Sequence, residues 1–345
     1  VIRFFDAKGA DITEGAQRKI ERLFLREDFR RVFPGEIGDI GFPPRHLELY
    51  AVALEQVVDV ERIAEAGFKV VVDYAYGSTS FVMPNILAKL GADVLAVNPF
   101  ASTSGLMRYD RDQHAAAVAN LVTASGASLG AVIDPDGENL TLVDDSGHVL
   151  SDDEALLAFV TLVARHLDGG SIALPLSATA HAERLAEEHG VGILRTKMSN
   201  AALMEAASRP GVGFAANTEG GFILPRFLPA FDGAAAMVRM LELLALDGTQ
   251  LSKVVGSLPR VHVAHETVVT PWEQKGTVMR SLVELSKDRE VDLVDGVKVH
   301  HDQGWALALP DPEEPVTHIW AEGGTAADAK RLAQEYARRI RQLLR

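Results

Sequence analysis

Phe68-Lys69-Val70-Val71-Val72-Asp73 decides the fold, because this stretch is β-branched and almost wholly apolar, as parallel strands buried on both faces are. Strands and helices alternate after it. Asp144-Asp145-Ser146-Gly147 is a hairpin turn signal between two short apolar runs. The pattern predicts a βαβ module. Its further expected elements are a helix at 80–90, a strand at 92–97, a helix near 113–123, a strand at 128–134 and a hairpin over 140–150.

The same alternation restarts after Asp152-Asp153-Glu154, which opens a second expected βαβ module. From Arg260 onward the pattern changes to short strands separated by turns, which is typical of an antiparallel sheet. We therefore expect an α/β fold class: two consecutive βαβ three-layer domains, a C-terminal α+β domain and a partial N-terminal domain. The expected strands are 171–175, 191–195, 212–216, 261–269, 297–301, 305–309 and 316–321, and the expected helices are 152–166, 180–189, 199–207, 233–245, 273–286 and 326–344.

The N-terminal residues contain one predicted strand, Ile2–Phe5, and one predicted helix, which Thr13 caps and which runs through Arg26. A further helix is expected from Arg45 to about Val58. A lone strand and helix cannot bury both of their faces. We therefore expect residues 1–45 to be part of a domain whose other layers lie upstream of Val1.

The composition excludes several classes of protein. The 345 residues carry 34 basic and 48 acidic side chains, a net charge of −14, which disfavours nucleic acid and anionic membrane surfaces as partners. The absence of cysteine excludes disulfides, a thiolate zinc site and a cysteine nucleophile. No apolar stretch reaches the roughly 18 residues of a membrane span. The expectation is a soluble cytoplasmic protein.

Three carboxylates occupy alternate positions in Asp134-Pro135-Asp136-Gly137-Glu138, just after a predicted parallel strand. Asp134, Asp136 and Glu138 could converge on Mg²⁺, which prefers oxygen ligands, and open α/β sheets bind ligands at this end of their strands. A solvated acidic turn is the alternative, because Asp, Pro and Gly are common turn residues. Both interpretations remain open from the sequence.

Two further segments follow predicted strands of the second module. In Asn217-Thr218-Glu219-Gly220-Gly221-Phe222, the paired glycines would let backbone amides approach a ligand, and Glu219 could accept hydrogen bonds from sugar hydroxyls. Arg195-Thr196-Lys197 is a cationic segment that could meet a phosphate, or could simply be solvated. We predict both segments as substrate-binding residues.

These features together resemble the α-D-phosphohexomutase superfamily, the four-domain phosphomannomutases and phosphoglucomutases. Val70 to Gly77 is similar to the family's V-V-V-D-x-A-x-G, Val143 to Leu150 to its hairpin after the metal loop, and Arg195-Thr196 with Met204-Glu205-Ala206 to its R-T…M-E-A run. The resemblance implies domains at 1–45 (a remnant of the first), 46–150, 151–256 and 257–345. It also places the phosphoryl-carrying serine upstream of Val1, so no catalytic residue is assigned here.

The site motifs depart from the family. Its metal loop D-G-D-G-D-R is replaced by Asp134 to Asn139, so we expect Mg²⁺ to bind weakly or not at all. The family's sugar loop G-E-x-S-G-H is replaced by Thr218 to Ile223, in which only the glutamate, Glu219, is clearly kept. Its phosphate loop R-P-S-G-T-E-P is replaced by a degenerate one, in which proline removes an N–H donor and carboxylates repel phosphate. The residues of this degenerate loop are Leu309, Asp311, Glu313, Glu314 and His318.

The resemblance is strongest to the mutase-like C-terminal region of mannose-1-phosphate guanylyltransferase fusions. It implies a catalytically reduced module in GDP-mannose-type metabolism. Such a module would sense a sugar phosphate or nucleotide sugar, or would act as a scaffold for a nucleotidyltransferase domain in the same polypeptide. A sugar phosphate or nucleotide sugar is the expected ligand, and an oligomer is expected. The rival hypothesis is an active Mg²⁺-dependent phosphomannomutase or phosphoglucomutase whose phosphoserine precedes Val1.

Overall fold

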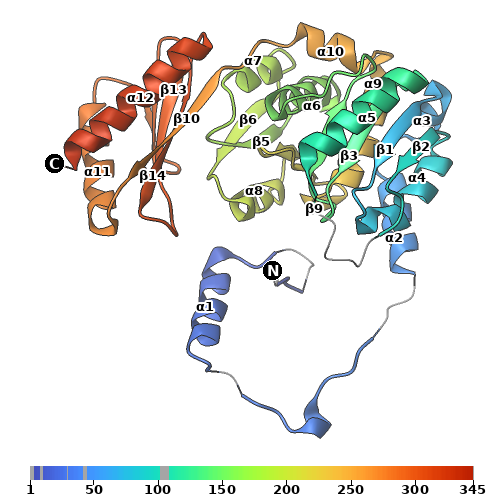
Figure 1. Ribbon diagram of the computed structural model, residues 1–345, viewed down its shortest axis with the longest axis horizontal. Coiled ribbons are helices and arrows are strands. Elements are labelled where there is room, and N and C mark those ends of the chain that lie inside the picture. Colours follow the sequence, from blue (N-terminus) through green and yellow to red (C-terminus); the bar gives the residue numbers. More distant parts are fainter. Residues whose placement is uncertain (1–3, 8–10, 29, 42–44, 102–108, 345) are drawn as a thin grey trace. The chain divides into compact units, whose positions relative to one another are not determined.

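The computed structural model describes residues 4–7, 11–28, 30–41, 45–101 and 109–344 (Figure 1). The chain divides into two compact units. The first consists of residues 1–149 and 221–250, and the second of residues 150–220 and 251–345. Residues 221–250, which the sequence assigns to the third domain, therefore group with the first unit. The four predicted domain boundaries stay predictions.

The first unit is built on a four-stranded sheet with the strand order β2-β1-β3-β4. Figure 1 labels β2, β1 and β3 of this sheet. β1 runs parallel to β2 and β3, whereas β4 runs antiparallel to β3. Val71 of β1 lies opposite Leu95 and Gly130, which fixes the register on both sides. The predicted βαβ module is confirmed. Its strands are β1 (Lys69–Asp73), β2 (Asp93–Val97), β3 (Leu129–Ile133) and β4 (Leu140–Val143).

Helices cover this sheet and begin at polar caps. Asp110 accepts a hydrogen bond from the Gln113 N–H at the start of α5, which packs Val118 and Val122 against Val71. α9 begins after Asp232 and contacts β3, β4 and the β8–β9 hairpin of the same unit. The elements are α2 (His46–Glu55), α3 (Val60–Ala66), η2 (Ser78–Phe81), α4 (Met83–Lys89), α5 (Arg111–Ser125), β8 (Phe222–Leu224), β9 (Leu228–Phe231) and α9 (Gly233–Asp247).

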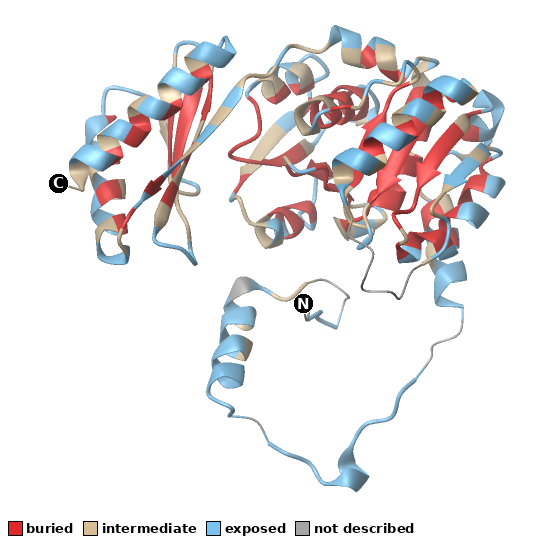
Figure 2. Cartoon of the chain, viewed as in Figure 1, coloured by how far each residue is buried: buried red, intermediate tan, exposed pale blue. Residues whose placement is uncertain are grey.

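The described N-terminal residues form α1 (Glu14–Leu25) and the short η1 (Pro34–Glu36). The Thr13 hydroxyl accepts a hydrogen bond from the Ala16 N–H, as predicted for the helix cap. Most side chains here are exposed, including Phe24 and Leu25 (Figure 2). Of the predicted strand, only the last two residues lie within the described residues, and Phe5 forms an isolated bridge to Asp11.

The second unit contains three parallel strands in the order β6-β5-β7. A capping box starts its first helix, because Ser151 accepts from the Glu154 N–H while Glu154 accepts from the Ser151 N–H. The second βαβ module is thereby confirmed. Its elements are α6 (Asp152–His166), β5 (Ser171–Pro175), α7 (His181–Glu187), β6 (Gly192–Thr196), α8 (Asn200–Ala207), β7 (Val212–Ala216) and α10 (Leu251–Ser257).

The C-terminal part of the second unit is an antiparallel sheet with the order β10-β14-β13-β12-β11. One face packs Val299 and Ile319 against Tyr336 and Ile340 of α12. On the other face, Trp305 packs against Leu176, from the segment that follows β5. The predicted α+β arrangement is confirmed. Its elements are β10 (Val263–Val269), α11 (Trp272–Leu285), β11 (Val291–Asp292), β12 (Val297–His301), β13 (Gly304–Pro310), β14 (Val316–Glu322) and α12 (Ala326–Leu343).

Five short elements are not predicted by the sequence pattern: α3, α10, β8, β9 and β11. They span only two to seven residues, too few to show a clear hydrophobic period. The helix predicted to end at Val58 ends at Glu55, and Asp59 caps the separate α3. Within the described ranges, no helix is both long and apolar enough to cross a membrane.

Candidate functional site

The acidic loop after β3 turns its first carboxylate back into the loop. Asp134 accepts hydrogen bonds from the Glu138 N–H and from the Asn139 side-chain amide, each at 2.8 Å. Gly137 has φ +80°, a left-handed conformation that glycine adopts readily, and its N–H donates to the Asp134 carbonyl oxygen. Burial raises the pKa of Asp134, although the hydrogen bonds from Asn139 oppose the shift.

Neighbouring segments of the first unit hold this loop in place. A side chain at Gly77 would bring its Cβ within 2.8 Å of the Pro135 carbonyl oxygen, so only glycine fits there. The Gly233 N–H, at the start of α9, donates to the Gly137 carbonyl oxygen at 2.8 Å. Asp136, Gly137 and Glu138 line an open pocket of about 500 Å³, together with Tyr50, Thr79 and Asp232.

Tyr50 and Asp232 form the polar wall of this pocket. The Tyr50 hydroxyl lies 2.9 and 2.8 Å from the two carboxylate oxygens of Asp232. Burial raises the pKa of Asp232 and, together with the Asp232 charge, that of Tyr50. The tyrosine therefore stays protonated and donates to the carboxylate.

The carboxylates of the acidic loop are hard oxygen donors, the type that suits Mg²⁺. Across the described part of the chain, however, no three acidic or histidine side chains are grouped so that they could hold a metal ion. The loop conformation therefore does not assemble the predicted ligand set of Asp134, Asp136 and Glu138. A magnesium site at this loop stays a prediction.

A carboxylate–imidazole cluster that the sequence did not reveal lies at the carboxyl ends of β1 and β2. Asp73 ends β1 and is 1% exposed, and its carboxylate lies 2.7 Å from His114 Nδ1. It also accepts hydrogen bonds from the Ala75 N–H at 2.8 Å and from the Asn98 side-chain amide at 2.9 Å. The only sequence signal was the place of Asp73 and Asn98, each at or just after the end of a strand.

The predicted sugar loop follows β7 (Val212–Ala216) in the second unit. The Glu219 N–H donates to the Asn217 side-chain oxygen at 2.9 Å, which makes an Asx turn, and Gly220 has φ +84°. The Glu219 side chain is exposed, whereas Gly220 and Gly221 are buried. The predicted loop is thus present with its carboxylate facing solvent.

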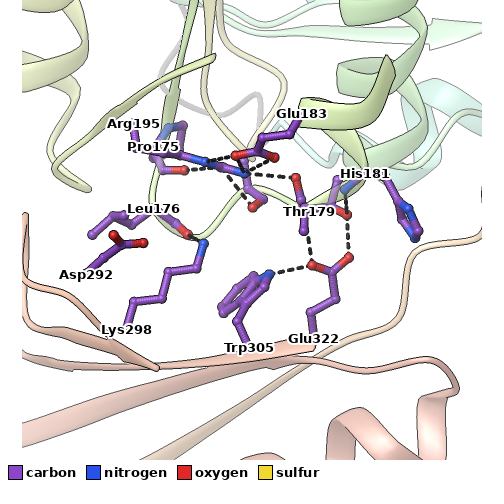
Figure 3. Close-up of polar contacts among 12 residues, drawn as sticks. Pro175, Leu176, Thr179, His181, Glu183, Arg195, Asp292, Lys298, Trp305 and Glu322 are labelled. Atoms are coloured by element: carbon purple, nitrogen blue, oxygen red, sulfur yellow. Dashed lines mark hydrogen bonds and ion pairs between the residues drawn. The ribbon is translucent and has the colours of Figure 1, made fainter. Parts of the chain in front are cut away.

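Arg195 has a different environment from the solvated cation that its sequence suggested (Figure 3). Its guanidinium pairs in a bidentate manner with Glu183, at 2.7 Å for both hydrogen bonds, and donates to the carbonyl oxygens of Pro175, Ala178 and Thr179 at 2.9–3.1 Å. These contacts fix the segment that follows β5.

The other two residues of the predicted cationic segment differ from each other. Thr196 is buried and donates its hydroxyl to the Lys197 carbonyl oxygen at 2.9 Å. Lys197 itself is exposed. Of the three predicted residues, Lys197 is therefore the cation that is accessible to a phosphate.

The degenerate loop between β13 and β14 satisfies its own backbone donors. Asp311 accepts hydrogen bonds from the N–H groups of Glu313 and Glu314, both at 2.7 Å, and contacts His318 Nε2 at 3.1 Å. These interactions, chiefly the two backbone bonds, lower the pKa of Asp311. Lys275 also donates to the carbonyl oxygens of Asp311 and Glu314. Leu309 lies within β13, opposite His318.

Comparisons with known proteins match both α/β/α modules. Residues 48–147 match the model of the phosphoglucomutase/phosphomannomutase alpha/beta/alpha domain II, and residues 151–261 match that of domain III. Together the two matches cover more than half of the chain.

Proteins named as mutases of the same family align with almost the whole chain. A protein of Methanopyrus kandleri named "Probable phosphoglucosamine mutase" is 27% identical over 99% of this chain and 75% of its own length. The phosphoglucomutase/phosphomannomutase of Thermococcus kodakarensis is 26% identical over 97% of this chain and 73% of its own. The crystal structure of a phosphoglucomutase/phosphomannomutase family protein from Burkholderia thailandensis has the same fold, with a TM-score of 0.80, 20% identity and coverage of 97% and 71%. The chain belongs to the phosphohexomutase superfamily.

Proposed function

We propose that the protein is an active phosphohexomutase, which moves a phosphoryl group between two hydroxyl positions of one hexose phosphate. The observation that carries this proposal is the match to both α/β/α domains, which includes the acidic loop and the sugar loop. The mutase names of its relatives support the same activity. The family resemblance places the phosphoryl-carrying serine in the first domain.

The described residues would share the binding of the substrate. Glu219 is exposed after β7 and would accept hydrogen bonds from sugar hydroxyls, while Lys197 is the accessible cation for a phosphate. Arg195 would act as a positioning residue, because its donors hold the segment after β5.

A second candidate is the catalytically reduced module, which would sense sugar phosphates or nucleotide sugars, or scaffold a guanylyltransferase domain of the same polypeptide. One observation favours it. The carboxylate of Asp311 occupies the N–H groups of Glu313 and Glu314, which would otherwise be offered to a phosphate.

A mutase assay separates the two candidates. The full-length protein is supplied with mannose-1-phosphate or glucose-1-phosphate, Mg²⁺ and a bisphosphorylated sugar activator, and the 6-phosphate is quantified. Turnover that falls in Glu219→Ala but not in the exposed control Glu187→Ala supports the mutase. Absence of turnover, with calorimetric binding of a sugar phosphate or nucleotide sugar, supports the reduced module.

A further inference from the structure

The Asp73–His114 cluster lies where strained backbone surrounds a buried carboxylate. Five non-glycine residues of the described chain have positive φ, and three of them flank this cluster: Ala75 (46°), Tyr76 (59°) and Asn98 (47°). Such a conformation costs about 1–2 kcal/mol for an ordinary L-residue and persists only where the surroundings enforce it. Backbone strain of this kind is typical of ligand sites.

The contact with Asp73 fixes the chemical form of the imidazole. An ionised carboxylate can only accept, so His114 Nδ1 carries the proton and donates across 2.7 Å. With this Nδ1–H tautomer, Nε2 is a hydrogen-bond acceptor whenever the ring carries a single proton. No described residue is paired with Nε2, and the side chain keeps 16% of its surface exposed.

Aromatic rings flank the imidazole. The Tyr109 ring centroid lies 5.2 Å away in a tilted arrangement, and the Tyr76 ring lies 6.5 Å away, edge-on. Burial, followed by the charge of Asp134, raises the pKa of Tyr109 to about 12, so its hydroxyl remains a donor at neutral pH. An acceptor nitrogen beside aromatic surface and a hydroxyl donor suits a hydroxylated ring. The carboxylates of Asp73 and Asp134 disfavour an anion here.

We propose that His114, oriented by Asp73, binds the hexose ring of the substrate by accepting a hydrogen bond from a sugar hydroxyl at Nε2. The identity of the ligand rests on the proposed function, whereas the Nδ1–H tautomer and the partial exposure of the His114 side chain rest on the geometry above. Asp73 is a positioning residue in this proposal, since it acts through the imidazole.

Nitrogen-15 NMR of the histidine rings in the 345-residue chain tests the proposal directly. Mannose-1-phosphate, mannose and inorganic phosphate are added separately to the labelled protein. We expect mannose-1-phosphate and mannose at high concentration to shift the His114 Nε2 signal, and inorganic phosphate to leave it unchanged. A His114 signal that responds to none of them, or to phosphate alone, overturns the proposal.

Two variants separate binding from packing. His114→Phe keeps an aromatic ring but removes the acceptor, and the loss of one hydrogen bond should weaken sugar-phosphate binding roughly 2- to 10-fold. Asp73→Asn should let the new amide donate to Nδ1, which moves the ring proton to Nε2 and is visible as exchanged nitrogen shifts. His189→Gln, an exposed histidine in the second unit, is the control.

The outcomes distinguish this proposal from the mutase activity itself. Turnover with an unchanged KM in both variants would overturn the role of His114 and leave the mutase intact. Absence of turnover in the wild-type protein, with a sugar-dependent shift at Nε2, would overturn the mutase and support the binding residue. If a variant does not fold, the wild-type titration decides.

Discussion

Lys298 donates a hydrogen bond across 2.8 Å to the carbonyl oxygen of Leu176, although only 2% of this lysine is exposed (Figure 3). Its ammonium group also lies 4.3 Å from the centre of the Trp305 ring. Burial lowers the pKa of Lys298 to about 8, the nearby charge of Arg195 adds to the shift, and Glu183 opposes it. The contact joins β12 to the segment after β5 within the second unit.

The buried lysine predicts a pH dependence of stability. Between about pH 8 and the usual lysine pKa near 10.5, the unfolded chain binds a proton that the folded chain has lost. The free energy of unfolding should therefore rise with pH in this window, by at most about 3 kcal/mol, and be flat with respect to this group below pH 8. Urea denaturation at several pH values measures the rise.

Lys298→Met isolates the contribution, because methionine keeps an unbranched apolar side chain without the titrating group. The difference in unfolding free energy between wild type and this variant should change between pH 8 and 10.5. The same difference for the exposed control Lys330→Met should stay constant. Parallel pH curves for wild type and Lys298→Met would show that the lysine is not perturbed.

Glu322 is a second buried charged residue beside Trp305, the ring that Lys298 also contacts (Figure 3). Its carboxylate accepts hydrogen bonds from the Thr179 hydroxyl, the Ala180 N–H and the Trp305 indole. Glu322→Ala would leave the buried donors of Thr179 and Trp305 without their acceptor, which costs about 1–3 kcal/mol for each unsatisfied group. We expect a loss of at least about 2 kcal/mol in unfolding free energy, measured by urea denaturation.

The matched control is Glu284→Ala, which removes an exposed carboxylate from an exposed ion pair with Lys287. Such a pair contributes at most about 1 kcal/mol, so its loss should be small. Glu322→Gln should fall between the two, since an amide oxygen still accepts hydrogen bonds. A Glu322→Ala protein as stable as the control would refute the assigned network.

Much of the fold was predictable because its signals are local. The apolar runs at β1 and β3, the acidic opening of α6 and the Thr13 cap of α1 are properties of neighbouring residues, and each was confirmed. The β8–β9 hairpin was not predicted, because strands of three and four residues are too short to show a period.

The candidate site was less predictable because its contacts are distant in sequence. Asp73 and His114 are 41 residues apart, and no spacing rule joins a strand end to the first turn of a later helix. Arg195 looked like an exposed cation until its pairing with Glu183 was known. For the loop at Asp311, the sequence predicted the loss of phosphate donors but not that the aspartate itself covers two amides.

The acidic loop predicts weak metal binding. Asp134 already accepts hydrogen bonds from Glu138 and Asn139, so a cation must compete with the loop's own contacts. We expect Mg²⁺ or Mn²⁺ titration by calorimetry to give a dissociation constant in the millimolar range or no measurable binding. A micromolar site that disappears in Asp136→Ala, but persists in the control Asp145→Ala of the neighbouring turn, would contradict this.

In the loop between β13 and β14, the carboxylate of Asp311 already satisfies the N–H groups of Glu313 and Glu314. A bound phosphate would have to displace this carboxylate and would meet like charges. We therefore expect the native loop to bind sugar phosphate poorly. Asp311→Ser alone should free the two amides and raise the affinity modestly.

Restoring more of the family's phosphate-loop pattern should raise the affinity for sugar phosphate further. Leu309→Arg, Asp311→Ser, Pro312→Gly and Glu313→Thr together supply a cation, two hydroxyls and another N–H. Each new charge-assisted hydrogen bond contributes roughly 1.5–3 kcal/mol, so even one should raise sugar-phosphate affinity tenfold or more by calorimetry. Asp302→Ser, in the exposed turn between β12 and β13, removes one negative charge without freeing these amides and should leave affinity unchanged. Micromolar binding by the native loop, with no gain on restoration, would show that Asp311 does not block the site.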